Sequence, residues 1–299
     1  MGEAQSAARG ASGWRVFVLA ARPRTLPAAV APVLVGTAAA QRVIPGRLAL
    51  ALLVGLALQV GVNYANDYFD GVRGVDTPDR VGPPRAVASG MATPAAIRRA
   101  MLAAFAVAAV AGLALGLLVD WRLVALGAVC LLAAVGYSGG PKPYASAGLG
   151  EVFVFVFFGL VATVGSAYAQ REAVVPAAVV AAVCIGLLAS ALLVVNNLRD
   201  IDTDRAAGKR TLAVRLGRTG TKRLFAAMVV LGVLGATAVA MVSGSPAPLL
   251  GLLAAPLAFS PLRIVRREAD PRRLIAALGA TARLELVFGV LLAAGLWVA

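Results

Sequence analysis

Carboxylate and carboxamide side chains are concentrated in two short stretches of an otherwise apolar chain. The first covers residues 66–76 (Asn-Asp-Tyr-Phe-Asp-Gly-Val-Arg-Gly-Val-Asp) and the second covers residues 197–204 (Asn-Leu-Arg-Asp-Ile-Asp-Thr-Asp). Seven of the 14 acidic residues of the chain lie in or beside these stretches: Asp67, Asp70, Asp76, Asp79, Asp200, Asp202 and Asp204. Because carboxylates are costly at the membrane end of an apolar helix, binding of a hard divalent cation is the leading explanation for their position.

Helical spacing places the polar side chains of each stretch on one face of a helix. Residues at i, i+3 or i+4, and i+7 share a face, and each stretch contains such a set: Asn63, Asp67 and Asp70, and Asn197, Asp200 and Asp204. If the two faces oppose each other, four carboxylates and two amides converge on one cavity, where oxygen ligands suit Mg²⁺. Asp202 lies off the shared face, and we expect it to point to loop groups or water.

Basic residues follow both acidic stretches. Arg80 and Arg85 come after the first, and Lys209 and Arg210 come after the second. Acidic groups for a metal beside basic groups for phosphate are the arrangement of a metal-bridged diphosphate site. The alternative is a structural one, in which helix-end carboxylates pair with loop arginines. Two matching stretches on the same side of a membrane favour the diphosphate site.

The elements that position these residues are long apolar runs. Hydrophobic residues form 60% of the 299 residues and charged residues 14%, which predicts an all-α, polytopic membrane protein. No linker divides the chain, so we expect a single domain over residues 1–299, with 1–13 as a disordered cytoplasmic tail. Nine runs have spanning length, at about 25–41, 48–69, 95–118, 122–138, 150–170, 173–197, 222–243, 247–263 and 282–298.

Basic residues strongly favour one side of this arrangement. The segments on that side carry 23 Lys and Arg residues, whereas the segments on the other side carry 4. The positive-inside rule then predicts a multi-pass protein of the cell inner membrane with a cytoplasmic N-terminus, both acidic stretches facing the cytoplasm, and an external C-terminus. The net charge of +14 lies in short loops, which favours lipid headgroups and an anionic substrate over nucleic acid as partners.

Other metal chemistry is disfavoured by the composition. The chain has no histidine, and its two cysteines, Cys130 and Cys184, both lie inside apolar runs. The usual zinc, haem and iron–sulfur sites need clustered residues of these types. We therefore interpret both cysteines as inert residues of the helix interior.

The two acidic stretches resemble the aspartate-rich motifs of the UbiA superfamily of intramembrane aromatic prenyltransferases. Within it, further stretches resemble the branch that acts on 1,4-dihydroxy-2-naphthoate; together they cover about residues 22–217. One departure concerns the first motif, whose pattern has a third acid four residues after the second, where this chain has Gly74. Asp76 is two positions further on and is a less certain metal ligand than Asp67 and Asp70. The stretches that carry the branch resemblance are residues 22–27, 66–70, 79–85, 137–144, 148–151 and 196–212.

The resemblance implies a mechanism that the residues support. Mg²⁺ held by the aspartates binds the diphosphate of an allylic polyprenyl diphosphate, and the carbocation left by its departure is attacked by a ring carbon of the aromatic acceptor, with loss of the acceptor carboxylate, to give demethylmenaquinone. The implied metal ligands are Asp67, Asp70, Asp76, Asp200 and Asp204. The implied diphosphate ligands are Arg80, Arg85, Lys142, Lys209, Asn66 and Asn197, and the implied acceptor ligands are Asn63, Tyr137 and Tyr144.

Several alternatives stay open at this point. Tyr137 and Tyr144 also suit the interface belt of a membrane protein, and Glu151 is either a charge at a helix N-terminus or a substrate contact. Residues 139–141 (Gly-Gly-Pro) favour a tight turn over a phosphate cradle. The sequence leaves the isoprenoid length and the oligomeric state undetermined.

Other activities are the remaining alternatives. A related prenyltransferase could act on 4-hydroxybenzoate, homogentisate or a glycerol phosphate lipid. A CDP-alcohol phosphotransferase would carry a single extended aspartate motif, whereas this chain has two separate stretches. A cation transporter would place its acids near the middle of the membrane without neighbouring arginines.

Overall fold

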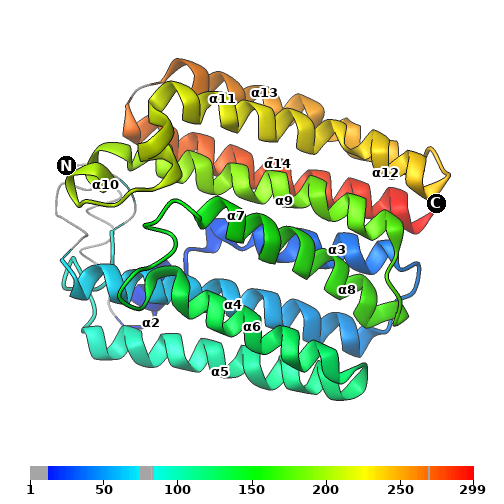
Figure 1. Cartoon of the computed structure of the whole chain (residues 1–299), viewed down its shortest axis with the longest axis horizontal. Helices are drawn as coiled ribbons and strands as arrows, with labels where there is room; N and C mark the ends of the chain where they lie inside the picture. The colour runs from blue at the N-terminus through cyan, green and yellow to red at the C-terminus, as the bar shows by residue number, and fades with distance from the viewer. Residues whose placement is uncertain (1–12, 75–81, 83, 269) are drawn as a thin grey trace.

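The computed structural model describes residues 13–74, 82, 84–268 and 270–299, and all regular elements in these ranges are helices. Eight of them are long and apolar enough to cross a membrane, and a bent helix pair at the N-terminal end brings the number of candidate spans to nine if the pair is counted as one span (Figure 1). The predicted all-α membrane fold is thereby confirmed. The eight spans are α4 (Pro45–Val72), α5 (Pro94–Leu118), α6 (Trp121–Ser138), α7–η2–α8 (Gly150–Val154, Phe155–Val161, Ala162–Arg171), α9 (Pro176–Arg199), α11–α12 (Leu212–Leu234, Ala236–Ser243), η3–α13 (Ala247–Ala254, Ala255–Arg267) and α14 (Pro271–Trp297).

The broken pair consists of α2 (Trp14–Ala21) and η1 (Pro23–Thr25), followed after a bend of 52° by α3 (Pro27–Ala39). Helix α2 ends at its C-terminal cap, Arg22, which adopts a left-handed conformation with φ 52°, and Pro23 and Pro27 then start new helical segments. Helix α2 was not among the predicted spans. It lies against α4, where the Tyr64 hydroxyl donates a hydrogen bond of 3.0 Å to the Phe17 carbonyl.

Helix α9 is the most buried span, and α11, α14 and η2 pack around it. Small residues allow close approach, as expected between helices in a membrane. A Cβ added to Gly159 in η2 would lie 2.5 Å from the Cα of Gly186 in α9, and a Cβ added to Gly289 in α14 would lie 2.8 Å from the Cβ of Ala31 in α3. On the other side of α3 and α8, helices α4, α5 and α6 form a second group (Figure 1).

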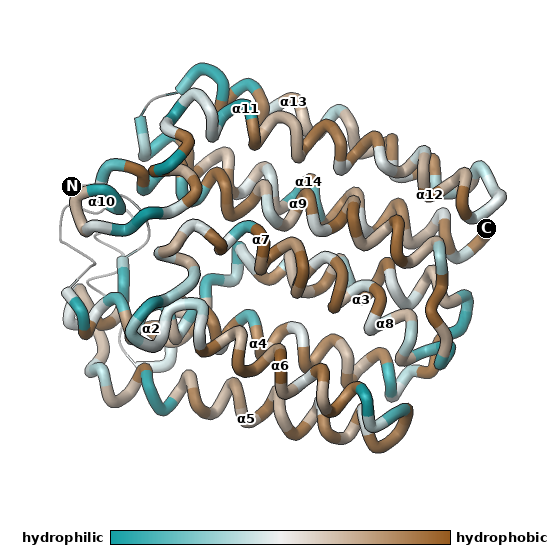
Figure 2. The backbone as a smooth tube through the Cα atoms, in the orientation of Figure 1, coloured by the Kyte–Doolittle hydropathy of each residue, from teal (hydrophilic) through white to brown (hydrophobic). Residues whose placement is uncertain are grey.

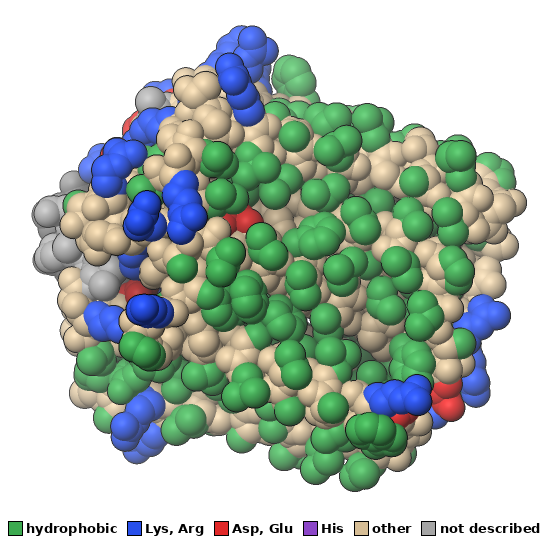
Figure 3. Space-filling view, in the orientation of Figure 1, with side chains coloured by type: hydrophobic (Ala, Val, Ile, Leu, Met, Phe, Trp, Pro, Cys, Tyr) green, Lys and Arg blue, Asp and Glu red, His purple; other side chains and the backbone are tan. Residues whose placement is uncertain are grey.

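Apolar residues predominate along the middle of the helices, and polar residues gather towards their ends (Figure 2). Leu117, Leu132 and Val110 are 77%, 74% and 69% exposed, which suits contact with lipid. Lysines and arginines cluster at the end that holds α10 (Ile201–Ala206), as Figure 3 shows. The described residues of both acidic stretches lie at this end.

Two spans extend well beyond the predicted apolar runs. Helix α14 begins at Pro271, eleven residues before the predicted start at 282, with the Asp270 carboxylate accepting a hydrogen bond from the Arg272 amide. Helix α11 begins at Leu212 rather than 222, and Gly217 interrupts it with φ 68°. Both extensions carry basic residues, so hydropathy marked only the part of each helix that lies in the membrane.

Candidate active site

A small polar pocket of about 80 Å³ lies where the two acidic stretches meet. The structure thus brings together side chains that are about 130 residues apart in the sequence. The pocket is lined by Arg22, Asn66, Asp70, Arg85, Tyr137, Ser138, Ala145, Ser146, Asn196, Asn197, Asp200, Thr203, Asp204, Lys209 and Thr211.

A helix break shapes the second acidic stretch. Helix α9 ends at Arg199, Asp200 follows as its C-terminal cap, and the Thr203 hydroxyl donates a hydrogen bond of 2.9 Å to the Asp200 carbonyl. Asp200 and Asp204 both line the polar pocket. Asp202 points to the surface instead, where its carboxylate contacts Arg218 at 2.5 Å. The expectation that Asp202 lies off the shared face is confirmed.

Two carboxylates of the polar pocket form ion pairs with basic side chains. Asp200 makes a buried bidentate pair with Arg199 at 2.7 and 2.6 Å, and Asp70 lies 3.1 Å from the Lys209 ammonium. Such pairing offsets the cost of removing charge from water. Within the described ranges, no three Asp or Glu side chains are close enough together to hold a metal ion. The predicted residues Asp76 and Arg80 fall outside those ranges.

Asp67 has a different position from the other three aspartates. It is 1% exposed, and its two oxygens accept hydrogen bonds from the backbone amides of Ala86 and Val87, each at 2.9 Å. It therefore fixes the turn that follows Arg85, which itself lines the polar pocket. Lys142, a predicted diphosphate ligand, is exposed and is not among the residues that line the polar pocket.

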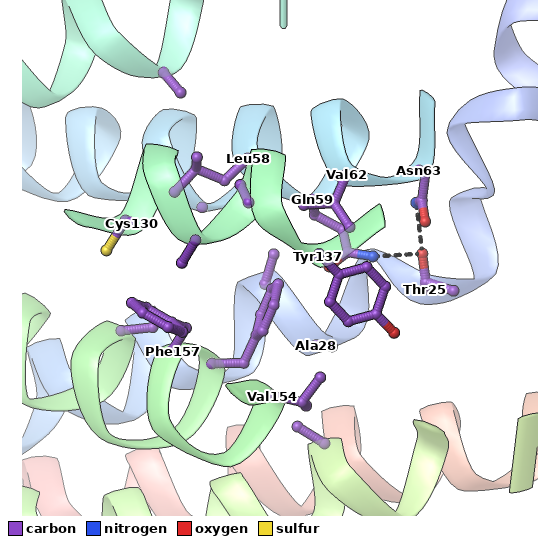
Figure 4. Close-up of a pocket in the computed structure, with 18 of the residues that line it drawn as sticks. Thr25, Ala28, Leu58, Gln59, Val62, Asn63, Cys130, Tyr137, Val154 and Phe157 are labelled. Atoms are coloured by element: carbon purple, nitrogen blue, oxygen red, sulfur yellow. Dashed lines mark hydrogen bonds between the residues drawn. The ribbon is translucent and has the colours of Figure 1, made fainter. Parts of the chain in front are cut away.

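A second, apolar cavity of about 920 Å³ adjoins the polar pocket. It runs along α4 between α3, α5, α6 and the α7–η2–α8 span, and aliphatic and aromatic side chains make up most of its wall (Figure 4). Five residues line both spaces, and they mark the junction: Arg22, Asn66, Arg85, Tyr137 and Asn196.

A polar cluster lies on the wall of the apolar cavity, around Thr25 (Figure 4). The side-chain amides of Gln59 and Asn63 each donate a hydrogen bond of 3.0 Å to the Thr25 hydroxyl. Their side-chain oxygens are thereby left as hydrogen-bond acceptors. Asn63 was predicted as a site residue, whereas Thr25 and Gln59 were missed. Gln59 could have been found, because it lies four residues before Asn63 and so shares its helix face.

Aromatic rings form a row that starts at the junction. Tyr137 and Tyr144 make an edge contact with centroids 5.5 Å apart, and Tyr144 stacks on Phe153 at 3.7 Å. Phe157 continues the row 5.7 Å from Phe153. Burial raises the pKa of the Tyr144 hydroxyl, which donates a hydrogen bond to the Ala133 carbonyl. All four rings line the apolar cavity, so neither tyrosine has the position of an interface-belt residue.

Glu151 connects α7 to the second acidic stretch. It is 4% exposed, and its carboxylate accepts a hydrogen bond of 2.9 Å from the side-chain amide of Asn197. This contact orients Asn197, whose side-chain oxygen is left for the polar pocket. Glu151 itself is not among the residues that line the pocket, so its contact with the site is through Asn197.

Comparison with known proteins adds independent information. Residues 29–298 match the sequence profile of the UbiA prenyltransferase family. A 1,4-dihydroxy-2-naphthoate octaprenyltransferase of Mycobacterium tuberculosis is 46% identical over 283 residues, which are 94% of this chain and 96% of that protein.

Two solved structures share the fold. A UbiA homolog from Aeropyrum pernix K1, in its apo form, has a TM-score of 0.70 at 17% identity and covers 91% of this chain and 97% of its own. A UbiA homolog from Archaeoglobus fulgidus bound to DMAPP and Mg²⁺ has a TM-score of 0.65 at 16% identity and covers 92% and 98%. At these identities, the similarity concerns the fold alone.

Proposed function

Because this chain belongs to the UbiA prenyltransferase family, we propose that it transfers a polyprenyl group from an allylic diphosphate to 1,4-dihydroxy-2-naphthoate. The acceptor would lose its carboxylate as CO₂, and the immediate product would be the hydroquinone demethylmenaquinol, which gives demethylmenaquinone on a separate two-electron oxidation. The observation that carries this proposal is the polar pocket joined to a long apolar cavity. An isoprenoid diphosphate has the same two parts, a multiply charged head and an apolar tail.

The basic residues of the polar pocket would bind the diphosphate. Arg22, Arg85 and Lys209 line this pocket from three separate segments of the chain. Arginine and lysine make strong, charge-assisted hydrogen bonds to phosphate oxygens. They would also stabilise the charge that grows on the diphosphate as it leaves with the electrons of the allylic C–O bond.

The donor set of the polar pocket fits a divalent cation. Asp70 and Asp204 offer carboxylate oxygens and Asn197 offers an amide oxygen, and Mg²⁺ prefers oxygen ligands together with substrate phosphates. A Mg²⁺ ion held there would neutralise charge on the diphosphate. The Archaeoglobus fulgidus homolog bound to DMAPP and Mg²⁺ supports this choice of cofactor. Asp67, Asp76 and Asp200 remain proposed ligands of the same ion.

The aromatic acceptor would lie near the junction, between the Thr25 cluster and the aromatic row. Tyr137 and Tyr144 present rings to which a naphthalene ring can stack, and the oxygens of Gln59 and Asn63 can accept hydrogen bonds from its hydroxyl groups. This position holds a ring carbon beside the allylic carbon. The new C–C bond forms at the ring carbon that carries the carboxylate.

We further propose that the site faces the cytoplasm in the bacterial inner membrane. The basic residues that gather at the α10 end support this orientation (Figure 3), because the positive-inside rule assigns such an end to the cytoplasm. The substrates would then reach the polar pocket from the cytoplasmic leaflet.

An acceptor screen with purified protein tests the proposed function. With a polyprenyl diphosphate and Mg²⁺, we expect prenylation of 1,4-dihydroxy-2-naphthoate and release of one CO₂ per product. The kcat/KM for 4-hydroxybenzoate should be lower by about 100-fold or more, because a site shaped for two fused rings binds one ring poorly. Preference for 4-hydroxybenzoate, or a product that keeps the carboxylate, would refute this acceptor and leave the prenyltransferase activity itself in place.

Replacing Thr25 by Val tests the acceptor site. The change keeps the side-chain volume but removes the hydroxyl that accepts both amide hydrogen bonds. Gln59 should then lose its orientation, whereas Asn63 keeps its hydrogen bond of 2.8 Å to the Ala21 carbonyl. At about 1 kcal/mol for the orienting bond that Gln59 loses, we expect the KM for the naphthoate to rise about fivefold. The KM for the diphosphate should be unchanged. Thr25→Ser keeps the hydroxyl and serves as the control; a KM raised equally in both variants would contradict this role.

A further inference from the structure

The apolar cavity extends far beyond the space that the reacting groups need. Asn66 lines it at the junction and Ala51 lines it near the other end, and both belong to α4. The 15 residues between them correspond to about 22 Å along the helix axis. The acceptor and the reacting carbon occupy only the junction, which leaves the outer half of the cavity without a role in the reaction.

Buried apolar side chains line the far end of the cavity. Val33, Ala51 and Leu115 are buried in one apolar cluster there, with Leu123 packed against it, and all four line the cavity. Outside this cluster, Arg47 joins three spans, because its guanidinium donates to the carbonyls of Leu118 and Ala169 at 3.1 and 3.0 Å and contacts Glu172 at 2.7 Å. An occupant that reaches this end of the cavity would therefore contact these buried apolar side chains.

A second contact joins the α5–α6 turn to α8 near the same end. The Tyr168 hydroxyl donates a hydrogen bond of 2.6 Å to the Asp120 carboxylate, which also accepts one of 2.9 Å from the Arg122 amide. Both hydrogen bonds lower the pKa of Asp120, so this contact persists at neutral pH. The α5–α6 turn is fixed by it.

Two glycines leave the outer half of the cavity open. Gly127 in α6 and Gly165 in α8 both line the cavity, and a Cβ added to either would meet no atom within 4 Å. Gly159, on the same span as Gly165, shows the opposite case, because α9 occupies the space that a side chain at this position would need. Close helix packing therefore explains Gly159 but not Gly127 or Gly165. Ten residues separate Gly127 from Tyr137, which is about 15 Å along α6.

We propose that Gly127 and Gly165 determine how long an isoprenoid chain the enzyme accepts, because the fourth and later isoprene units lie against them. Each unit adds four chain bonds, or about 5 Å at ordinary bond lengths and angles. About three units therefore span the distance from Tyr137 to Gly127, and longer chains must enter the outer half. This inference rests on the proposed prenyl transfer and assigns its chain-length specificity to two named positions.

Leucine substitutions at the two glycines test the proposal. For Gly127→Leu and Gly165→Leu, kcat/KM is measured with geranyl diphosphate, which has two isoprene units, and with geranylgeranyl diphosphate, which has four. We expect the value for the longer substrate to fall at least tenfold and the value for geranyl diphosphate to stay within twofold. Gly127→Ala and Gly165→Ala should show the same selectivity to a smaller degree.

Gly279→Leu is the matched control. Gly279 is also a helical glycine whose added Cβ meets nothing within 4 Å, but it does not line the cavity, so neither substrate should be affected. Equal losses for both substrates in the Gly127 and Gly165 variants, or no loss for either, would overturn the proposal and place the tail elsewhere. A wild-type protein that prenylates the naphthoate with neither of these diphosphates, nor with a longer polyprenyl diphosphate, would instead refute the proposed function.

Discussion

Replacing Asp70, Asp200 or Asp204 by Asn should lower kcat by about 100-fold or more, the size of effect seen when one group that stabilises transition-state charge is removed. All three line the polar pocket. Asn has nearly the same shape as Asp but lacks the charge that a divalent cation and its diphosphate need. Excess chelator should abolish the activity of the wild type, and added Mg²⁺ should restore it.

The three variants differ in how much they disturb the fold in addition to the proposed metal-bridged diphosphate site. Asp200→Asn leaves the buried Arg199 guanidinium without its carboxylate partner, which can cost several kcal/mol of stability. Asp204→Asn keeps a side-chain oxygen that can accept the 3.5 Å hydrogen bond from the Thr211 hydroxyl. The amount of folded protein in the membrane is therefore measured together with the initial rate.

Asp202→Asn is the matched control from the same stretch. Its carboxylate is 65% exposed and contacts Arg218 and Arg205 on the surface, so we expect a rate within twofold of the wild type. Near-normal activity in any two of the three pocket variants would contradict the metal-bridged diphosphate site. A large loss in Asp202→Asn would show that the charge of the whole stretch, rather than the pocket, controls the rate.

Much of this fold could be predicted from the sequence, because apolar runs of spanning length report directly on burial in lipid. The meeting of Asp70 with Asp200 and Asp204 followed from helical spacing and from the side of the membrane assigned to each stretch. Basic extensions of a helix carry no such signal, which is why the starts of α11 and α14 were placed too late.

The parts of the site that could not be predicted depend on contacts between distant segments. Thr25 meets Gln59 and Asn63 next to the bend between η1 and α3, which the sequence does not specify. Helical spacing placed Asp67 with Asp70, but it could not show that backbone amides of the next turn occupy both Asp67 oxygens. Helical periodicity predicts the face on which a side chain lies, but it does not predict which group that side chain contacts.

The last prediction concerns this second role of Asp67. Asp67→Asn should release the turn at residues 86–90, because an amide side chain can accept only with its oxygen and turns a donor towards the other backbone N–H. Hydrogen bonds to a charged group contribute about 1.5–3 kcal/mol each, so the open form of the turn should become at least tenfold more populated. Arg85 would then lose its fixed position in the polar pocket, and turnover would fall even where metal binding persists.

A cysteine at position 86 measures the opening directly. Ala86 is 1% exposed, so Ala86→Cys should react with a small, charged maleimide only when the turn opens, while Cys130 and Cys184 lie within membrane spans. We expect labelling to be at least tenfold faster when Asp67→Asn is added and unchanged when Asp70→Asn is added. Both double variants lose a carboxylate of the same stretch, so only the hydrogen bonds to the turn distinguish them. Equal labelling rates in the two would mean that Asp67 does not hold the turn and that its contribution to turnover comes through the metal alone.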